Sequence, residues 1–167
     1  MSSPIKVGDK IPSGHIFVTT TNPQEVGACA LPLNVKSEDV LGKGKVVLVA
    51  VPGAFTPTCH LKHLPGFVEH ADAFKAKGVS QIYFTSTNDV YVLDAWAKHE
   101  KAHNVQVLAD GNGTWAAAIG FPFDLSAKHM GAVRTKRYAL VIEDGVVTYV
   151  GDGDLTVSGA EAVLAKL

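Results

Sequence analysis

Cysteine is scarce in this chain: only Cys29 and Cys59 occur among its 167 residues. The N-terminus, Met-Ser-Ser-Pro-Ile-Lys, lacks the positively charged start and the apolar stretch of a secretory signal. We therefore expect the chain not to reach an oxidising compartment by the secretory route. We expect both cysteines to be thiols in the resting protein.

The chain also has little net charge, and its apolar runs are short. The formal net charge is -1 and the basic side chains are scattered, which argues against a nucleic-acid partner. The longest apolar stretch, Val46 to Phe55, is interrupted by Pro52 and Gly53 and falls far short of the roughly 20 residues that cross a bilayer, so we expect no membrane span. Because 47% of the residues are hydrophobic, the chain can bury a core, and we expect residues 1–167 to form a single domain.

Predicted strands and helices alternate along the chain. Residues 45–51 form a continuous, β-branched apolar run, which is typical of a strand covered on both faces. Residues 57–74 carry apolar side chains at helical spacing, with a kink expected at Pro65-Gly66. Strands at 81–86 and 105–108 enclose a helix that Asn88 or Asp89 can cap and that reaches about residue 100. This alternation predicts a layered α/β fold.

The C-terminal third contains a hairpin and a last helix. Residues 137–142 and 146–150 flank an Asp144-Gly145 turn, the strongest hairpin signal in the chain. Ser158-Gly-Ala-Glu161 matches a capping box, which predicts that Ser158 begins the final helix.

The chemically informative segment is Pro52-Gly-Ala-Phe-Thr56-Pro-Thr-Cys59, where the first central strand ends and a helix begins. Thr56 followed by Pro57 is typical of an N-cap and a first-turn proline, which places Cys59 at about the third helical position. Unpaired backbone N–H groups there favour the thiolate, the nucleophilic form of cysteine. The local pattern alone leaves open a buried structural thiol, a disulfide reductase or an acyl transferase.

Pro52, Thr56 and Cys59 fit the P-x-x-x-T-x-x-C signature of peroxiredoxins, and the longer string with His63-Leu-Pro-Gly-Phe67 resembles the type II members. The resemblance implies a thioredoxin fold of the peroxiredoxin type, with a central mixed β-sheet flanked by helices and no cofactor. It also implies that Cys59 reduces hydrogen peroxide and small organic hydroperoxides and becomes a sulfenic acid. By the same resemblance Pro52 shields the pocket, and Arg137, rather than Arg134, points at the sulfur beside the Thr56 hydroxyl.

The sulfenic acid must be trapped by a second thiol before it is overoxidised. The positions that carry this thiol in mammalian and plant relatives hold Val157 and Phe84 here. Resemblance to a fungal branch assigns the role to Cys29, often across a homodimer interface, although Cys29 could be incidental and an external thiol could act instead. The family implies thioredoxin, glutaredoxin or glutathione as reductant. The alternative function is a peroxide sensor that relays oxidation to client thiols.

A disulfide needs Cα atoms within about 7 Å of each other, yet Cys59 begins inside a helix. We therefore expect the first turn, around residues 58–61, to unwind after oxidation.

Two further features of the sequence are the histidines near Cys59 and the C-terminal tripeptide. His60, His63 and His70 lie near Cys59, but no C-x-x-C or H-E-x-x-H pattern accompanies them, so we expect no metal site. The final Ala165-Lys166-Leu167 is a close variant of the Ser-Lys-Leu peroxisomal address, and it is also an ordinary amphipathic helix end. The localisation expected is cytoplasmic, peroxisomal or both.

Overall fold

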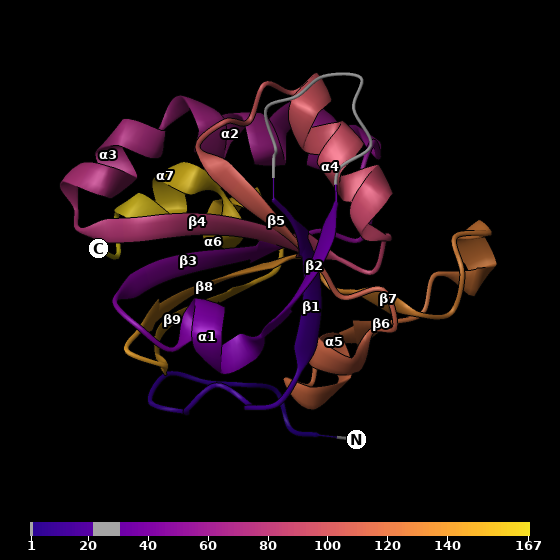
Figure 1. Ribbon diagram of the computed structural model, residues 1–167, viewed down its shortest axis with the longest axis horizontal. Coiled ribbons are helices and arrows are strands. Elements are labelled where there is room, and N and C mark those ends of the chain that lie inside the picture. The colour runs from indigo at the N-terminus through magenta and orange to yellow at the C-terminus, as the bar shows by residue number, and fades with distance from the viewer. Residues whose placement is uncertain (1, 22–30) are drawn as a thin grey trace.

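The computed structural model describes residues 2–21 and 31–167. A seven-stranded sheet with the strand order β2-β1-β5-β4-β3-β8-β9 runs through its centre (Figure 1). The strands are β1 (Ile16–Thr20), β2 (Pro32–Lys36), β3 (Lys45–Ala50), β4 (Val79–Ser86), β5 (Val105–Ala109), β6 (Pro122–Phe123), β7 (Arg134–Thr135), β8 (Tyr138–Glu143) and β9 (Val146–Asp152). The helices are α1 (Ser37–Leu41), η1 (Cys59–His63), α2 (Leu64–Glu69), α3 (Ala71–Ala76), α4 (Val90–His99), α5 (Thr114–Ala118), η2 (Ser126–Lys128), α6 (Leu155–Ser158) and α7 (Ala160–Leu164).

The sheet is mixed. β3, β4 and β5 are parallel neighbours, whereas β8 joins the free side of β3 antiparallel and β1 joins β5 antiparallel. β9 and β2 add an antiparallel strand at each edge, and β6 and β7 form a separate two-stranded sheet. The predicted layered α/β architecture, a central mixed sheet flanked by helices, is confirmed.

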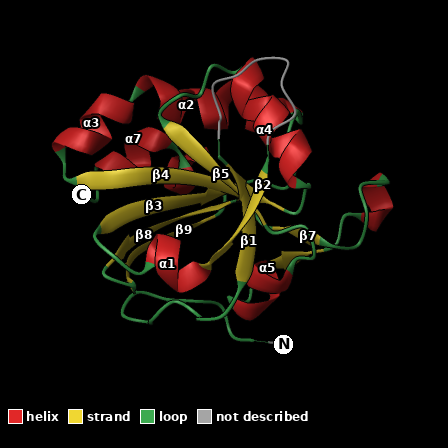
Figure 2. Cartoon of the chain, viewed as in Figure 1, coloured by secondary structure: helices red, strands yellow, loops and turns green. Residues whose placement is uncertain are grey.

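Helices cover both faces of the sheet, which explains the continuous apolar run in β3. In Figure 2, α2, α3, α4 and α7 lie on one side and α1 and α5 on the other. Val47 and Val49 point into the core under the first group, whereas Val46 and Leu48 point into the core under the second. Successive residues of a strand face opposite sides, so a strand buried on both faces has no polar positions.

The helical segment after β3 differs from the single kinked helix that the pattern predicts. Residues 59–63 form a π-helical turn, which gives way to α2 one residue before Pro65. A proline ring collides with the carbonyl of the fourth residue before it, and the wider π turn relieves that collision. The chain then breaks at His70, with φ -96° and ψ 9°, before α3 begins; the apolar spacing continues through this break and did not predict it.

Two caps also depend on contacts that spacing does not specify. Asp89, not Asn88, caps α4, and its carboxylate accepts from the backbone N–H of Val92.

The capping box predicted at Ser158 is wrong. α7 begins after Gly159 without a side-chain cap, because the Ser158 hydroxyl turns back and donates to the carbonyl oxygens of residues 153 and 154, at 3.0 and 2.8 Å.

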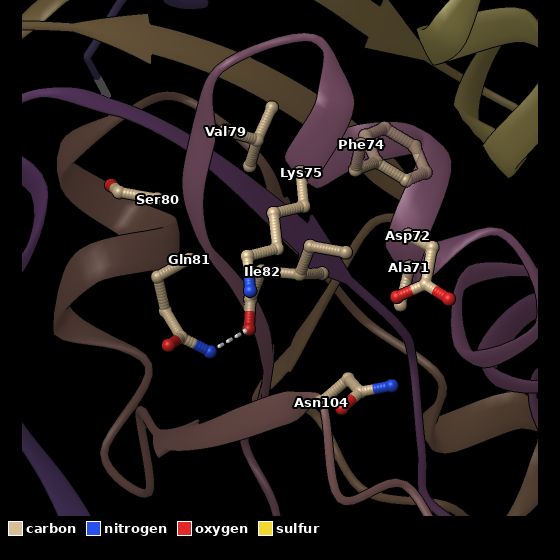
Figure 3. Close-up of a pocket in the computed structure, with 9 residues that line it drawn as sticks. All are labelled: Ala71, Asp72, Phe74, Lys75, Val79, Ser80, Gln81, Ile82 and Asn104. Carbon is tan, nitrogen blue, oxygen red and sulfur yellow. Dashed lines mark hydrogen bonds between the residues drawn. The ribbon is translucent and has the colours of Figure 1, made fainter.

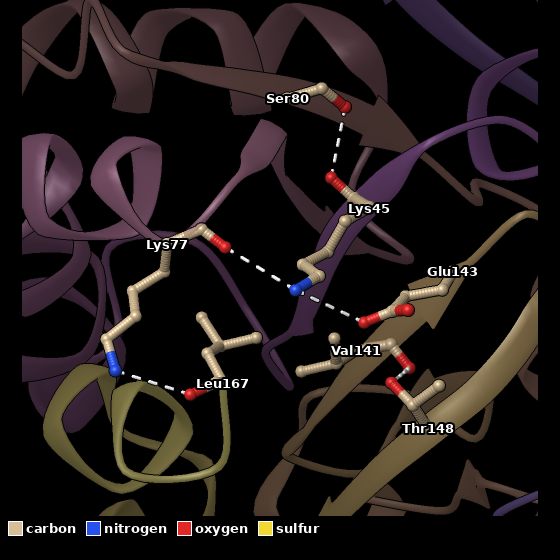
Figure 4. A network of polar contacts seen from close by, with 7 residues as sticks. All are labelled: Lys45, Lys77, Ser80, Val141, Glu143, Thr148 and Leu167. Atoms are coloured by element: carbon tan, nitrogen blue, oxygen red, sulfur yellow. Dashed lines mark hydrogen bonds and ion pairs between the residues drawn. The ribbon is translucent and has the colours of Figure 1, made fainter.

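The hairpin is present as predicted, with Asp144 and Gly145 both at positive φ, as a two-residue turn of this type requires. Polar contacts tie the turn end of the hairpin to β3 and, through Lys77, to the C-terminal residue Leu167 (Figure 4). The ammonium of Lys45 lies 3.3 Å from the Glu143 carboxylate and 3.4 Å from the carbonyl oxygen of Lys77, and the Lys77 ammonium in turn donates to the carbonyl of Leu167. In the described ranges, every helix is too short or too polar to cross a membrane.

Candidate active site

Cys59 lies where the carboxyl end of β3 runs into the first helical turn. That turn starts at Pro57 and is closed by the N–H of His60, which donates to the carbonyl of Thr56 at 2.8 Å. Cys59 is thus the third helical residue, as the N-cap and proline pattern predicts. Its side chain is only 1% exposed and lies at the edge of the core formed by α2, α4 and the sheet.

The guanidinium of Arg137 reaches this buried sulfur, with Nη2 3.1 Å from Sγ of Cys59. Strand register explains the contact. Ala50, the last residue of β3, pairs with Tyr138, the first residue of β8, so Arg137 lies beside the chain as it leaves β3 for the cysteine loop. The contact is a charge-assisted hydrogen bond that holds the sulfur beside a fixed positive charge.

Thr56 and Arg134 hold the loop that precedes the cysteine. The Thr56 hydroxyl donates its proton to the carbonyl of Gly53 at 2.8 Å, which leaves the oxygen lone pairs to accept a further hydrogen bond. The Arg134 guanidinium donates to the carbonyl of Met130 at 2.7 Å and lies 3.4 Å from the carbonyl of Pro52. Of the two arginines weighed from the sequence, Arg137 contacts the sulfur and Arg134 contacts the loop backbone.

A third support comes from the end of β4. The side-chain oxygen of Asn88 accepts from the backbone N–H of Ala54 at 2.9 Å and from the hydroxyl of Ser86 at 2.7 Å. These contacts join the cysteine loop to the neighbouring parallel strand. From the sequence, Asn88 is predicted only as a possible helix cap, and this second role was missed.

His63 is the site residue whose position the sequence analysis missed, because it was considered only as a metal ligand. Its Nδ1 accepts from Nη1 of Arg137 at 2.8 Å, and its Nε2 donates to the carbonyl of Ser158 at 2.8 Å. Arginine can only donate, so this pattern defines a neutral ring with its proton on Nε2. Burial, together with the neighbouring guanidinium, lowers the pKa of His63 to about 4. Its position four residues after Cys59, on the same helix face, was the signal available in the sequence.

The remaining expected residues lie elsewhere. Cys29 lies outside the described residues. The Nδ1 of His70 bonds to the carbonyl of Gly66, and His60 faces α4, so the fold separates the three histidines weighed as a metal site. Trp96 and Trp115 are both buried in the core.

A hollow of about 330 Å³ between α3 and the start of β4 contains none of the candidate residues (Figure 3). Polar and charged side chains, among them Asp72 and Lys75, make up much of its lining. The chemistry available at Cys59 therefore does not involve this hollow.

Comparison with known proteins agrees with this geometry. The Redoxin family model matches residues 6–164. Peroxiredoxin-2C of rice is 42% identical over 99% of both chains, and peroxiredoxin AHP1 of Chaetomium thermophilum is 35% identical over 99% of this chain and 96% of its own. The crystal structure of reduced Prx3 from Vibrio vulnificus in complex with hydrogen peroxide superposes with a TM-score of 0.83 at 36% identity, covering 96% of this chain and 94% of that one.

These matches extend over nearly the whole chain and all name the same family. They therefore decide against the structural thiol, the disulfide reductase and the acyl transferase that the cysteine loop alone leaves open. The chain belongs to the peroxiredoxins, has their thioredoxin fold, and is a thiol-dependent peroxidase whose curated relatives are type II members.

Proposed function

We propose that Cys59 is the nucleophile of this peroxidase and that it reduces hydrogen peroxide and small organic hydroperoxides. The thiolate sulfur attacks the terminal oxygen of the hydroperoxide, an S–O bond forms and the O–O bond breaks. The sulfur loses two electrons and becomes a sulfenic acid, while the departing oxygen takes up a proton and leaves as water or an alcohol. The observation that carries the proposal is the 3.1 Å contact between Cys59 Sγ and the Arg137 guanidinium.

Arg137 and Thr56 have different roles in this step. Arg137 presents N–H donors beside the sulfur, where they stabilise the thiolate and the negative charge that develops on the breaking O–O bond. Because the Thr56 hydroxyl already donates to Gly53, it is assigned as the acceptor that orients the O–H of the hydroperoxide. Pro52 shields the sulfur from bulk solvent. Since Cys59 is 1% exposed, the site favours small substrates.

The sulfenic acid is then resolved by Cys29 of a partner subunit in a homodimer. The resolving thiol attacks the sulfenic sulfur, water leaves, and a disulfide forms. Because Cys59 is buried within a hydrogen-bonded turn, residues 58–61 must unwind to bring the two Cα atoms within about 7 Å. A dithiol or glutathione-linked reductant, of the thioredoxin, glutaredoxin or glutathione type, regenerates both thiols.

The test of Cys59 and Arg137 is the second-order rate of peroxide consumption by the reduced protein. Cys59→Ser should abolish turnover while the fold is retained, because a serine hydroxyl is not ionised at neutral pH. Arg137→Met should slow attack by about 10² to 10³-fold, the usual loss on removing one charge-stabilising donor. Arg134→Met is the matched control, since this arginine contacts the loop backbone and not the sulfur, and it should retain most of the rate. Turnover by Cys59→Ser, or equal losses in the two arginine variants, would contradict the assignment.

The test of Cys29 is a non-reducing gel after treatment with one equivalent of peroxide. A disulfide-linked dimer is expected in the native protein and should be absent from Cys29→Ser and from Cys59→Ser. An internal bridge in a monomeric band would contradict the intersubunit route and retain the resolving role. Full thioredoxin-linked turnover by Cys29→Ser would contradict both and indicate an external thiol.

We propose a cytoplasmic and peroxisomal distribution, with Ala165-Lys166-Leu167 as the peroxisomal address. Leu167 packs against the core beside α7 and its carbonyl accepts from Lys77 at 3.3 Å (Figure 4), so a receptor that reads this tripeptide must first release it. Import of an N-terminally labelled full chain should therefore be weaker than import of a label that carries only residues 158–167. Lys77→Met should raise import of the full chain. Diffuse fluorescence from both labels would refute the address.

A further inference from the structure

A second cluster of titratable side chains lies beside Cys59 but outside the site described above. It consists of His60, in the π turn η1, and of His99 and Glu100, at the end of α4. One candidate ligand atom from each of the three residues lies within 4.8 Å of the other two. His60 is far in sequence from His99 and Glu100, and the packing of α4 against the cysteine turn brings the three together.

The two distances to the Glu100 carboxylate are close to those between ligands of one small cation. The Glu100 carboxylate oxygen lies 3.2 Å from Nδ1 of His60 and 2.9 Å from Nδ1 of His99. Two ligands that are each about 2.0 to 2.1 Å from a tetrahedral zinc ion lie about 3.3 Å apart. Two imidazoles and one carboxylate are also a ligand set that zinc takes with a fourth position open to solvent.

An N–H donor and a carboxylate oxygen both face the same nitrogen of His60. The indole N–H of Trp96 donates to Nδ1 at 3.2 Å, which requires a lone pair there, yet the Glu100 oxygen faces the same nitrogen. A cation between Nδ1 and the carboxylate would turn the repulsion between the two electron-rich atoms into attraction.

The surroundings leave an entry path and favour positive charge. His99 is 63% exposed, whereas His60 and Glu100 are 23% and 16% exposed, so the cluster opens to solvent on the His99 side. It lies at the C-terminal end of the ten-residue helix α4, the negative end of the helix dipole. The ring of Phe55 packs against both imidazoles, with centroids 5.6 and 5.8 Å away, and so helps to orient them.

We propose that His60, His99 and Glu100 form a binding site for a divalent transition cation of the zinc class. A bound ion clamps the turn that carries Cys59 to the end of α4. Formation of the disulfide requires that same turn to unwind, so the ion slows resolution of the sulfenic acid and leaves the first peroxide attack unchanged. This consequence rests on the proposed function, whereas binding of the ion does not.

The binding test uses the full chain with Cys29→Ser and Cys59→Ser, so that no thiolate can take the metal. Zinc titrated by calorimetry should bind with one equivalent, and cobalt should give a tetrahedral visible spectrum without a sulfur charge-transfer band. His99→Ala and Glu100→Gln should each weaken zinc binding at least about tenfold, since outer-shell losses alone cost that much. His103→Ala, an exposed histidine just beyond α4, is the matched control and should bind as tightly as the parent. Unchanged affinity in both cluster variants, or more than one equivalent bound without saturation, would overturn the site.

The functional test compares single-turnover peroxide attack with the rate at which the disulfide then forms, in the protein with both cysteines present. Saturating zinc should slow disulfide formation severalfold and leave the attack rate unchanged, and His99→Ala should be insensitive to zinc in both steps. Equal zinc inhibition of the native protein and of His99→Ala would overturn the clamp. Failure of the proposed function is distinguishable, because it would appear as peroxide turnover by Cys59→Ser, whereas zinc binding is measured without either thiol.

Discussion

The neutral, buried state of His63 makes a prediction about how the stability of this protein depends on pH. The ring is 1% exposed and accepts a hydrogen bond from Arg137, so a proton on Nδ1 would place two cationic donors against each other. Burial first, and then the charge of Arg137, lowers its pKa from the usual 6.5 to about 4, against the opposing contribution of the Ser158 carbonyl. The perturbation is therefore acidification, compared between the native protein and His63→Gln.

The direction and size follow from which state binds the proton. In the unfolded chain His63 takes up a proton as the pH falls through 6.5, whereas the folded protein does not bind it until about pH 4. The contribution is fully present above pH 6.5 and is lost as the pH falls towards 4. Each pH unit between 6.5 and 4 corresponds to about 1.4 kcal/mol. Acidification to pH 4 should therefore lower the free energy of unfolding by about 3 kcal/mol through this ring.

The assay is urea denaturation of the reduced protein at a series of pH values between 7 and 4, at one protein concentration so that any association between subunits is held constant. Other groups titrate in both proteins, so the diagnostic quantity is the difference in slope. The free energy of unfolding of His63→Gln should fall about 3 kcal/mol less than that of the native protein over this range. His103→Gln, which changes an exposed histidine, should keep the native slope. Parallel curves for His63→Gln and the native protein would refute the reasoning.

Three further substitutions test the supports of the fold by the same urea assay. Asp89→Ala removes the cap of α4 and should cost about 1 kcal/mol; an unchanged midpoint would show that the cap is not needed. Tyr138→Phe leaves the buried indole N–H of Trp115 without its 3.0 Å acceptor and should lower the free energy of unfolding by about 1 to 3 kcal/mol. Unchanged stability would show that this hydrogen bond is not needed. Gly120→Ala places a Cβ 2.6 Å from the backbone nitrogen of Pro4 at a φ of +75°, so it should cost at least about 1 kcal/mol, and full stability would contradict that close approach.

Local patterns in the sequence predicted the elements that carry the site. The apolar run of β3 is buried on both faces, the Asp144-Gly145 turn closes its hairpin, and Cys59 is the third residue of a helix. Each depends on neighbours a few residues apart, through side-chain alternation, positive φ or a proline at a helix start. The resemblance to the peroxiredoxins added Arg137, which no local pattern could separate from Arg134.

Contacts between distant segments were decided by the tertiary structure alone. Pairing of β3 with β8 brings Arg137 to the sulfur, and packing of the cysteine turn against α6 turns His63 from a metal candidate into the acceptor for that arginine. Ser158 has the sequence of a cap, yet its hydroxyl satisfies carbonyls of the preceding turn. Where a side chain could form a hydrogen bond with any of several nearby backbone groups, the packing of the backbone decides which of them lies within reach. Sequence spacing thus determined where the thiol and its helix lie, and strand register and helix packing decided which groups surround them.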